Sequence, residues 1–410
     1  MIGLRKIDTI DCSKLLSLDL DNMTWLPVFM VSAVVLNISV YWDPQAFGGL
    51  SRLFVGSTVL SFVVMLFLCL RRGTMSRFVA FSILMVLVLL ATSIISKNDI
   101  RRACIDGCSV AFIAMVCDYF KDRYKVVIYA FAFAFSLCAY MNFIHMLTHP
   151  ELWIVTEYKS GATYLLGGNY NQMGSRLICA ICTSILCMKY SRWWIVNAFG
   201  VTVVSILPLA IVGSMTSLTG IFLFLIFCFI PSNNFIKLGI IALIGLVILF
   251  QIFICFQGKG LEGNPLAVFI IQDILNKDMT FTYRTDMWEN AKQLFFDSPI
   301  FGYGVVDGDW YNIHLSSWAK GPHNTIWDIL INGGVILLSI YTYINYLVFS
   351  KLPSTHDKFS LIIFAAITSL NLMMVMEVYP LILIFSLLSL AYHSNHTACP
   401  PQGANNNHNE

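Results

Sequence analysis

The sequence has few charged residues and many apolar ones. Asp, Glu, Lys and Arg make up 12% of its 410 residues, whereas 58% of the residues are hydrophobic. A soluble domain normally carries about 25% charged residues. The composition therefore predicts an integral membrane protein. The net charge is only +2 and the basic residues are spread among the loops, so we expect no nucleic-acid partner.

Other features are missing as well. Residues 1–22 contain no apolar run followed by a small-residue cleavage site, so we expect no cleaved signal peptide. The two longest polar segments, 148–172 and 257–324, contain no cysteine, which argues against a disulfide framework. The cysteines lie mostly in apolar runs, where a thiol packs as a small hydrophobe. Cys179-x-x-Cys182 lies in such a run without a nearby His or acid, and we interpret it as packing.

Long apolar runs are what the sequence does contain. A membrane-spanning helix needs about 20 mainly apolar residues, and this rule predicts an all-α protein with about twelve spans. The predicted spans lie near residues 26–42, 53–70, 78–95, 103–120, 125–147, 173–188, 193–212, 215–231, 235–256, 325–349, 359–376 and 379–393. Asp106 interrupts the fourth of these runs, and Glu377 with Pro380 separates the last two.

The distribution of Lys and Arg predicts the orientation in the membrane. With the N-terminus in the cytoplasm, the cytoplasmic loops carry eleven positive residues and the opposite loops before the largest one carry six. We therefore expect both termini inside. Residues 1–256 would form an N-terminal bundle with the exported loop 148–172, and 257–324 a large exported loop. Residues 325–393 would form the C-terminal spans, and 394–410 a disordered tail.

The longest polar interruption of the apolar pattern runs from residue 282 to 334. Its first part predicts an amphipathic helix with the apolar stripe Tyr283, Met287, Trp288, Ala291, Leu294 and Phe295. Thr282 would cap this helix and Ser298-Pro299 would end it. His323 and Asn324 stand immediately before the next apolar run. Arg284 and His323 would thus bracket a segment lying against the membrane.

The order of residues in this segment resembles a known family. Arg284-x-x-x-Trp288, then Pro299-x-x-Gly302-x-Gly304, then His323-Asn324 and the pair Gly333-Gly334 resemble the O-antigen polymerase and O-antigen ligase superfamily. The resemblance implies a GT-C-like polytopic glycosyltransferase of the bacterial plasma (inner) membrane, with its active site on the exported face. It also implies a polyprenyl-diphosphate-linked glycan donor, a glycan or lipid-linked acceptor, contact with membrane lipid, and no cofactor or metal.

Two residues suit the chemistry that the resemblance implies. The guanidinium of Arg284 stays charged and can bind the departing diphosphate with two donors. His323 can accept a proton from the attacking sugar hydroxyl near neutral pH, or only orient the acceptor. Trp288 and Tyr303 are candidates for stacking on sugar rings, and Asn324 is a further candidate contact. For each of these residues the alternative is an ordinary interfacial or structural role.

A second polar segment contains Gly167-Gly168-Asn169-Tyr170-Asn171, which loosely resembles a Gly-Asn element of the superfamily. Asn171 and Arg176 are candidate substrate contacts, because an arginine within a span must face protein, water or an anion. Many relatives place Arg or Lys in the turn corresponding to 213–220, and this sequence has neither there. Arg176 or Lys159 would have to replace that cation.

Three functions stay open at this level. The loop resembles those of polysaccharide polymerases, which favours polymerization; a ligase that transfers the glycan to a lipid A core is the alternative. Asp106 and Pro208 would instead suit a transporter or flippase. Asp307-x-Asp309 has the spacing of a divalent-cation site. On the predicted topology, however, it lies away from cytoplasmic nucleotide sugars. The sequence leaves the oligomeric state open.

Overall fold

The computed structural model describes residues 25–41, 44–153, 164–269, 284–317 and 319–394, and these are almost entirely helical. The main helices are α2 (Trp25–Ser39), α3 (Pro44–Arg72), α4 (Arg77–Ser96), α5 (Ile100–Tyr119), α6 (Tyr124–Thr148), α7 (Tyr170–Cys187), α8 (Trp194–Ile211), α9 (Met215–Phe229), α10 (Asn233–Phe250), α14 (Thr325–Phe349), α15 (Lys358–Met374) and α16 (Leu381–Ser394). Within the described ranges, strand pairing is limited to two isolated bridges, Val40 with Leu166 and Tyr164 with Gly168.

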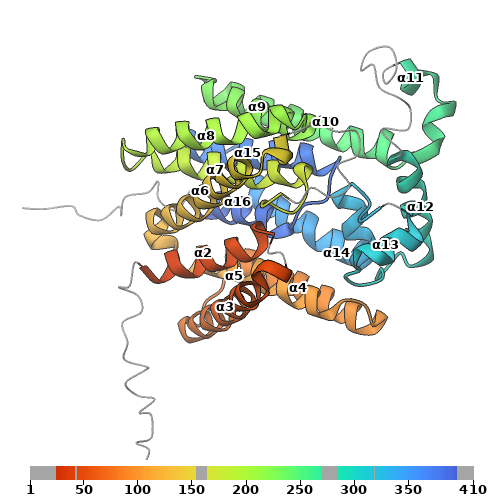
Figure 1. The fold of residues 1–410 in the computed structure, drawn as a ribbon, viewed down its shortest axis with the longest axis horizontal. Helices are drawn as coiled ribbons and strands as arrows, with labels where there is room; N and C mark the ends of the chain where they lie inside the picture. Colours follow the sequence, from red (N-terminus) through yellow and green to blue (C-terminus); the bar gives the residue numbers. More distant parts are fainter. Residues whose placement is uncertain (1–24, 42–43, 154–163, 270–283, 318, 395–410) are drawn as a thin grey trace, which may run out of the picture.

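The loop between α10 and α14 carries shorter helices. These are α11 (Pro265–Val268), α12 (Arg284–Asp297) and α13 (Gly308–His314), which lie on the right-hand side of the molecule in Figure 1, with α11 at the top and α13 next to α14. Helix α12 ends before Ser298-Pro299, as the sequence predicts. Its predicted cap Thr282 and the first stripe residue Tyr283 lie outside the described residues.

Every predicted span coincides with a helix, because long apolar runs leave the backbone no polar partner except itself. The boundaries are set by caps. Ser76 accepts from Val79 N at the start of α4 (3.4 Å), and Asp99 accepts from Arg102 N at the start of α5 (2.9 Å). The largest boundary difference is in α3, which begins at Pro44 and not near residue 53. Proline is favoured in the first turn of a helix, where its missing N–H costs nothing.

Six helical segments are long and apolar enough to cross a membrane: Gly49–Arg72, Arg77–Ser96, Lys121–Thr148, Trp194–Ile211, Asn233–Cys255 and Thr325–Phe349. Four shorter helices, α2, α9, α15 and α16, are also apolar. Large side chains such as Phe199 and Phe229 are exposed by 71% and 83%, as suits helices that contact lipid. The chain is thus a polytopic helical membrane protein, and the count of about twelve spans stays a prediction.

Helix α5 is the centre of the bundle. All of its residues from Gly107 to Asp118 are buried, and it packs against α3, α4 and α16. Asp106 precedes this buried stretch and pairs with Arg102 one turn away (3.6 Å), with 45% of its side chain exposed. The charge that interrupts the predicted span therefore lies in the more exposed, N-terminal part of α5, next to the cation of Arg102.

The loops gather into two groups, as alternating spans require. In the predicted exported group, Asp99 N donates to Val305 O (2.9 Å) and Tyr379 Oη to Asn171 O (3.2 Å). In the predicted cytoplasmic group, four side chains reach neighbouring loops: Arg72 to Tyr119 O, Lys189 to Asp357, Lys237 to Pro353 O and Asn233 to His356 O. Which group faces the cytoplasm stays a prediction.

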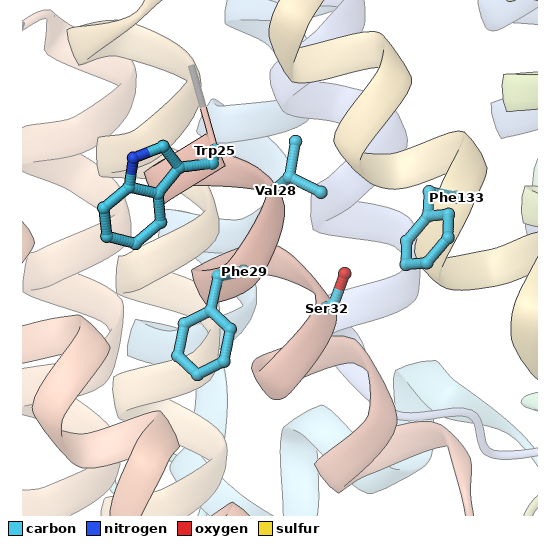
Figure 2. Close-up of a pocket in the computed structure, with 5 residues that line it drawn as sticks. All are labelled: Trp25, Val28, Phe29, Ser32 and Phe133. Atoms are coloured by element: carbon cyan, nitrogen blue, oxygen red, sulfur yellow. The ribbon is translucent and has the colours of Figure 1, made fainter. Parts of the chain in front are cut away.

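A groove opens on the outside of the bundle between α2 and α6. Figure 2 shows it lined by Trp25, Val28, Phe29 and Ser32 of α2 and by Phe133 of α6. Four of these five side chains are apolar, so the groove carries no group for phosphate or proton chemistry. It shares no residue with the polar site described next.

Candidate functional site

Arg284 and His323, 39 residues apart in the sequence, meet at one carboxylate. His323 Nδ1 lies 3.0 Å from Glu377 Oε2, and Arg284 Nη2 lies 3.9 Å from the same oxygen. The three side chains are exposed by 21%, 18% and 9% for His323, Arg284 and Glu377. A cation, an imidazole and a carboxylate therefore share a partly buried position at the end of the bundle where the predicted exported loops gather.

The contact with Glu377 selects one tautomer of a neutral imidazole, provided that the carboxylate is ionised. An ionised carboxylate only accepts hydrogen bonds, so Nδ1 must carry the proton that it donates to Oε2. In the neutral ring, the lone pair is then on Nε2. This arrangement of histidine and carboxylate suits general base catalysis.

The backbone at His323 is in an unusual conformation. Its φ is +46°, and among the described non-glycine residues only Lys97 also has a positive φ. Such residues cost free energy and persist where the surroundings hold them. One constraint comes from α12, where Trp288 is fully buried and its Nε1 donates to Pro322 O (3.1 Å). Trp288 therefore positions the His323 turn from within the protein.

Asn324 fixes the other side of the same turn. Its Oδ1 accepts from Trp327 N (3.0 Å), so it is the N-cap of α14. Its Nδ2 donates to Val375 O (3.0 Å) and to Gln251 Oε1 (2.8 Å). Asn324 is fully buried. Its contacts thus assign it a structural place beside His323.

Glu377 lies in the turn between α15 and α16 and is also held in place. Thr325 Oγ1 donates to Glu377 O (3.1 Å), and Val378 N donates to Glu377 Oε1 (3.3 Å). With Oε1 occupied, Oε2 is the oxygen that points to His323 and Arg284. The start of α14 and the end of α15 therefore form one unit around the histidine.

Residues Pro299–Val305, here called the strap, lie against α14. The glycines of the sequence pattern lie where the strap and α14 touch. Gly334 has φ +61° and ψ −160° within α14, and a Cβ there would lie 2.3 Å from Ile300 O. Gly302 has φ +62°, and its Cβ would lie 2.4 Å from Ile331 O. Both positions require glycine for conformation and for space. The strap and the kinked helix thus fit together only through these glycines.

The strap also binds the turn between α4 and α5. Asn98 Nδ2 donates to Tyr303 O (2.6 Å), and Val305 N donates to Ser93 Oγ (2.8 Å). The Tyr303 side chain is partly buried, and its Oη donates to Leu294 O (3.0 Å). Tyr303 therefore lies on the strap at the end of α12, and no described contact joins it to the His323 group.

Arg176 lies elsewhere and is buried, with 3% exposure. Its Nε donates to Ser39 O (3.2 Å), and its Nη1 donates to Gln172 O (2.6 Å). It thus binds carbonyl groups at the end of α2 and the start of α7. This geometry favours a structural role, and substrate contact by Arg176 stays a prediction. Lys159, the other cation considered for phosphate, lies outside the described residues.

Asn171 connects this region to the turn that carries Glu377. Its carbonyl oxygen accepts from Tyr379 Oη (3.2 Å), while Gln172 Nε2 donates to Val378 O (2.7 Å). The start of α7 therefore borders the site through the turn after α15.

The Asp307-x-Asp309 motif lies at the start of a helix, and the Cys179-x-x-Cys182 motif lies within one. Asp307 Oδ1 accepts from Trp310 N (2.8 Å) and caps α13, a short helix that the sequence did not reveal. Among the described residues, no group of three or more His, Cys, Asp or Glu side chains lies close enough to hold a metal ion. Cys179 and Cys182 are fully buried and free.

Sequence reasoning missed two residues of this site. Glu377 was noted only as a break between apolar runs, and Gln251 not at all. The available signal was weak: each is a single polar residue at the outer end of a predicted span. An ionisable residue within a span is a functional hypothesis by default, and Glu377 lies next to the predicted span 359–376. Gln251 is not ionisable, so this rule would not have singled it out.

Comparison with known proteins gives a family match for part of the chain. Residues 176–342 match a family model described as O-Antigen ligase. The match covers less than half of the chain and includes Arg284, Trp288 and His323, while Glu377 lies beyond it. No curated protein matched the sequence. Residues 176–342 are therefore similar to the O-antigen ligase family, and this match supports the resemblance of the chain to the O-antigen ligase and polymerase superfamily.

Proposed function

We propose that this protein is a polysaccharide polymerase of the exported face of the bacterial plasma membrane. It would transfer a glycan from its polyprenyl diphosphate carrier to a sugar hydroxyl of another lipid-linked repeat unit. The observation that carries the proposal is the meeting of Arg284 and His323 at Glu377, with Arg284 and His323 both inside the segment that matches the family model.

The reaction needs charge stabilisation at one place and proton removal at another. The acceptor oxygen attacks the anomeric carbon, and the bond from that carbon to the diphosphate breaks with its electron pair. Arg284 stabilises the charge that develops on the departing diphosphate. His323 Nε2 takes the proton from the attacking hydroxyl. The product glycan keeps one carrier, and the other carrier leaves as the free polyprenyl diphosphate.

Glu377 acts on both of these residues. It orients His323 through Nδ1 and stabilises the imidazolium that forms during transfer. It also lies 3.9 Å from Arg284, a distance too long for a direct hydrogen bond. An incoming diphosphate would therefore find the guanidinium near a carboxylate but not saturated by it. Donor binding and proton removal would be coupled through one side chain.

The remaining candidate residues would contribute from two positions. Trp288 and Asn324 are buried and would act by holding the turn that carries His323. Asn171 and Tyr303 are only partly buried, and we retain them as contacts for the saccharides. Arg176 would act through Gln172, whose side chain binds the turn next to Glu377.

The test uses purified protein in a membrane mimetic with a defined polyprenyl-diphosphate-linked repeat unit as the only substrate. We expect a ladder of longer lipid-linked glycans, separated by size, because a polymerase uses the same compound as donor and acceptor. A product that forms only when lipid A core is added would instead identify a ligase. No transfer under either condition, with the protein folded, would contradict the proposal.

A further inference from the structure

The helix α10 ends in a π-helical turn, η4 (Gln251–Cys255), where Phe256 N donates to Gln251 O (3.0 Å). Such single turns insert one residue into a helix and are frequent at functional sites. Gln251 follows the apolar run of α10 and is 7% exposed. An amide buried in an apolar environment is costly unless it is hydrogen-bonded.

The amide of Gln251 has its partners on α14. Gln251 Oε1 accepts from Asn324 Nδ2 (2.8 Å), and Gln251 Nε2 donates to Asn324 Oδ1 (3.4 Å). The two amides thus form a reciprocal pair. The same Asn324 Nδ2 also donates to Val375 O (3.0 Å). One buried contact therefore joins α10, the start of α14 and the end of α15.

The π-helical geometry brings a second residue to the same neighbours. Trp327 Nε1 donates to Cys255 O (3.2 Å), and Cys255 Sγ lies 3.9 Å from Val375 O. Between them, Ile252 and Phe253 are about half exposed and face outward. The wider turn places both Gln251 and Cys255 on the inner face of the helix, where they contact the two segments that carry the site.

Those two segments hold the reacting pair. Asn324 follows His323 directly, and Val375 precedes Glu377 by two residues. The reciprocal amide pair thus sets the position of His323 in its left-handed conformation and the position of Glu377 opposite its Nδ1. A shift of Gln251 would alter the distance between the base and the carboxylate that orients it.

We propose that Gln251 is a positioning residue for glycosyl transfer, acting through Asn324 on the His323–Glu377 pair. This inference rests on the function proposed above. It assigns to the π-helical turn the task of holding a buried amide against the catalytic turn, and it predicts a loss in the rate of transfer and not in donor affinity.

The test is a kinetic comparison of Gln251→Met, which keeps the length but removes the amide, with wild type. Misplacement of reacting groups by about 1 Å can cost roughly 100-fold in rate, so we expect kcat to fall by about 10- to 100-fold. We expect the donor KM to change by less than about twofold, because Arg284 is untouched. The pH dependence of kcat should also shift, because the imidazole no longer faces Glu377 in the same way.

Three comparisons separate positioning from general destabilisation. Ile252→Ala alters the outward face of the same turn and should keep the wild-type kcat. Gln251→Asn retains the amide but shortens the side chain, and it replaces Gln251→Met in the same kinetic comparison if Gln251→Met does not fold. In a double-mutant cycle with Glu377→Gln, the fold-loss of kcat in the double variant should be smaller than the product of the two single fold-losses.

If the two fold-losses of kcat simply multiplied and the pH profile stayed unchanged, the inference would be overturned, as it would by a Gln251→Met variant with wild-type kcat. A wild-type protein that transfers no glycan would overturn the proposed function, and this inference with it.

Discussion

At the scale of single residues, the central feature of the site is that the Glu377 carboxylate contacts both His323 and Arg284. Glu377 Oε2 faces both the imidazole and the guanidinium, while its Oε1 accepts from the backbone. In the proposed mechanism, the carboxylate orients the base and limits the positive charge of the group that would bind phosphate. These two effects act in opposite directions on donor binding and on the rate of transfer, so they can be separated by one substitution.

We expect Glu377→Gln to lower kcat by about 10- to 100-fold while leaving donor affinity the same or tighter. The amide can still accept from Nδ1 but cannot stabilise an imidazolium, and base catalysis contributes about 100- to 10,000-fold in enzymes. Arg284 would lose a neighbouring negative charge that competes with the diphosphate. The measurement is transfer rate against donor concentration.

Glu289→Gln is the matched control. Glu289 is a carboxylate on α12 that pairs with Lys292 (2.7 Å), away from His323. It should keep the wild-type kcat. If Glu377→Gln also kept the wild-type kcat, Glu377 would have no part in orienting the base.

At the scale of elements, close backbone contacts position the site. The strap Pro299–Val305 docks on the kink of α14: Val335 N donates to Pro299 O (2.9 Å) and Tyr303 N to Ile331 O (2.7 Å). These bonds use backbone groups that the kink removes from the helix ladder. The sequence pattern of paired glycines thus marks the docking of two segments, not a flexible hinge.

We expect Gly334→Ala to destabilise the protein by about 1–3 kcal/mol, the range for a strained backbone position. Its Cβ would lie 2.3 Å from Ile300 O, and the residue would have to keep φ +61°. Unfolding of the purified protein in detergent measures the change. Gly56→Ala in α3 is the control, since nothing lies within 4 Å of its Cβ. Equal stability of the two variants would show that the strap does not need the glycine.

A second element-scale contact joins three helices within the bundle. Asn197 Nδ2 of α8 donates to Ser136 Oγ of α6 and to Ser184 Oγ of α7, each at 3.0 Å. Side-chain hydrogen bonds between membrane helices contribute about 1 kcal/mol. We expect Asn197→Leu to lower the free energy of unfolding by about that amount.

Val196→Ala provides the comparison for Asn197→Leu, because Val196 is 68% exposed on the outer face of the same helix. It should change stability little. An Asn197→Leu variant as stable as Val196→Ala would mean that the network contributes nothing to helix association.

The sequence predicted most elements but not how they meet. Apolar runs define where helices lie, and the amphipathic stripe of α12 correctly identified Met287, Trp288 and Ala291 as buried. Glu377 is 54 residues from His323, and no spacing rule connects them. Trp288 and Asn324 were predicted as substrate contacts, yet both are buried in bonds to the protein. Which polar residues face each other depends on tertiary packing, and a single sequence does not show it.

At the scale of the whole molecule, the loops form two groups at opposite ends of the helices. The group with His323, Glu377 and the strap is the predicted exported one, and the other contains most of the lysines and arginines of the short loops. Lysine and arginine accumulate on the cytoplasmic side of membrane proteins. The site would then lie on the exported face, as the proposed function requires.

We expect single cysteines placed at the two ends to label differently in intact cells. Asp309 and His356 are both exposed, in the predicted exported and cytoplasmic loops respectively. A membrane-impermeant thiol reagent should label Asp309→Cys and spare His356→Cys until the cells are opened. The ten described native cysteines are buried or half-buried, and the unsubstituted protein measures their background. The reverse pattern would invert the topology.

The most direct test of the central claim compares Arg284→Ala and His323→Ala with wild type, measuring donor binding and glycan transfer on the same purified samples. We predict that His323→Ala still binds the polyprenyl-diphosphate-linked donor but transfers it about 100- to 10,000-fold more slowly, while Arg284→Ala loses donor affinity as well. Folded variants that bind and transfer like wild type would contradict the assignment of this site.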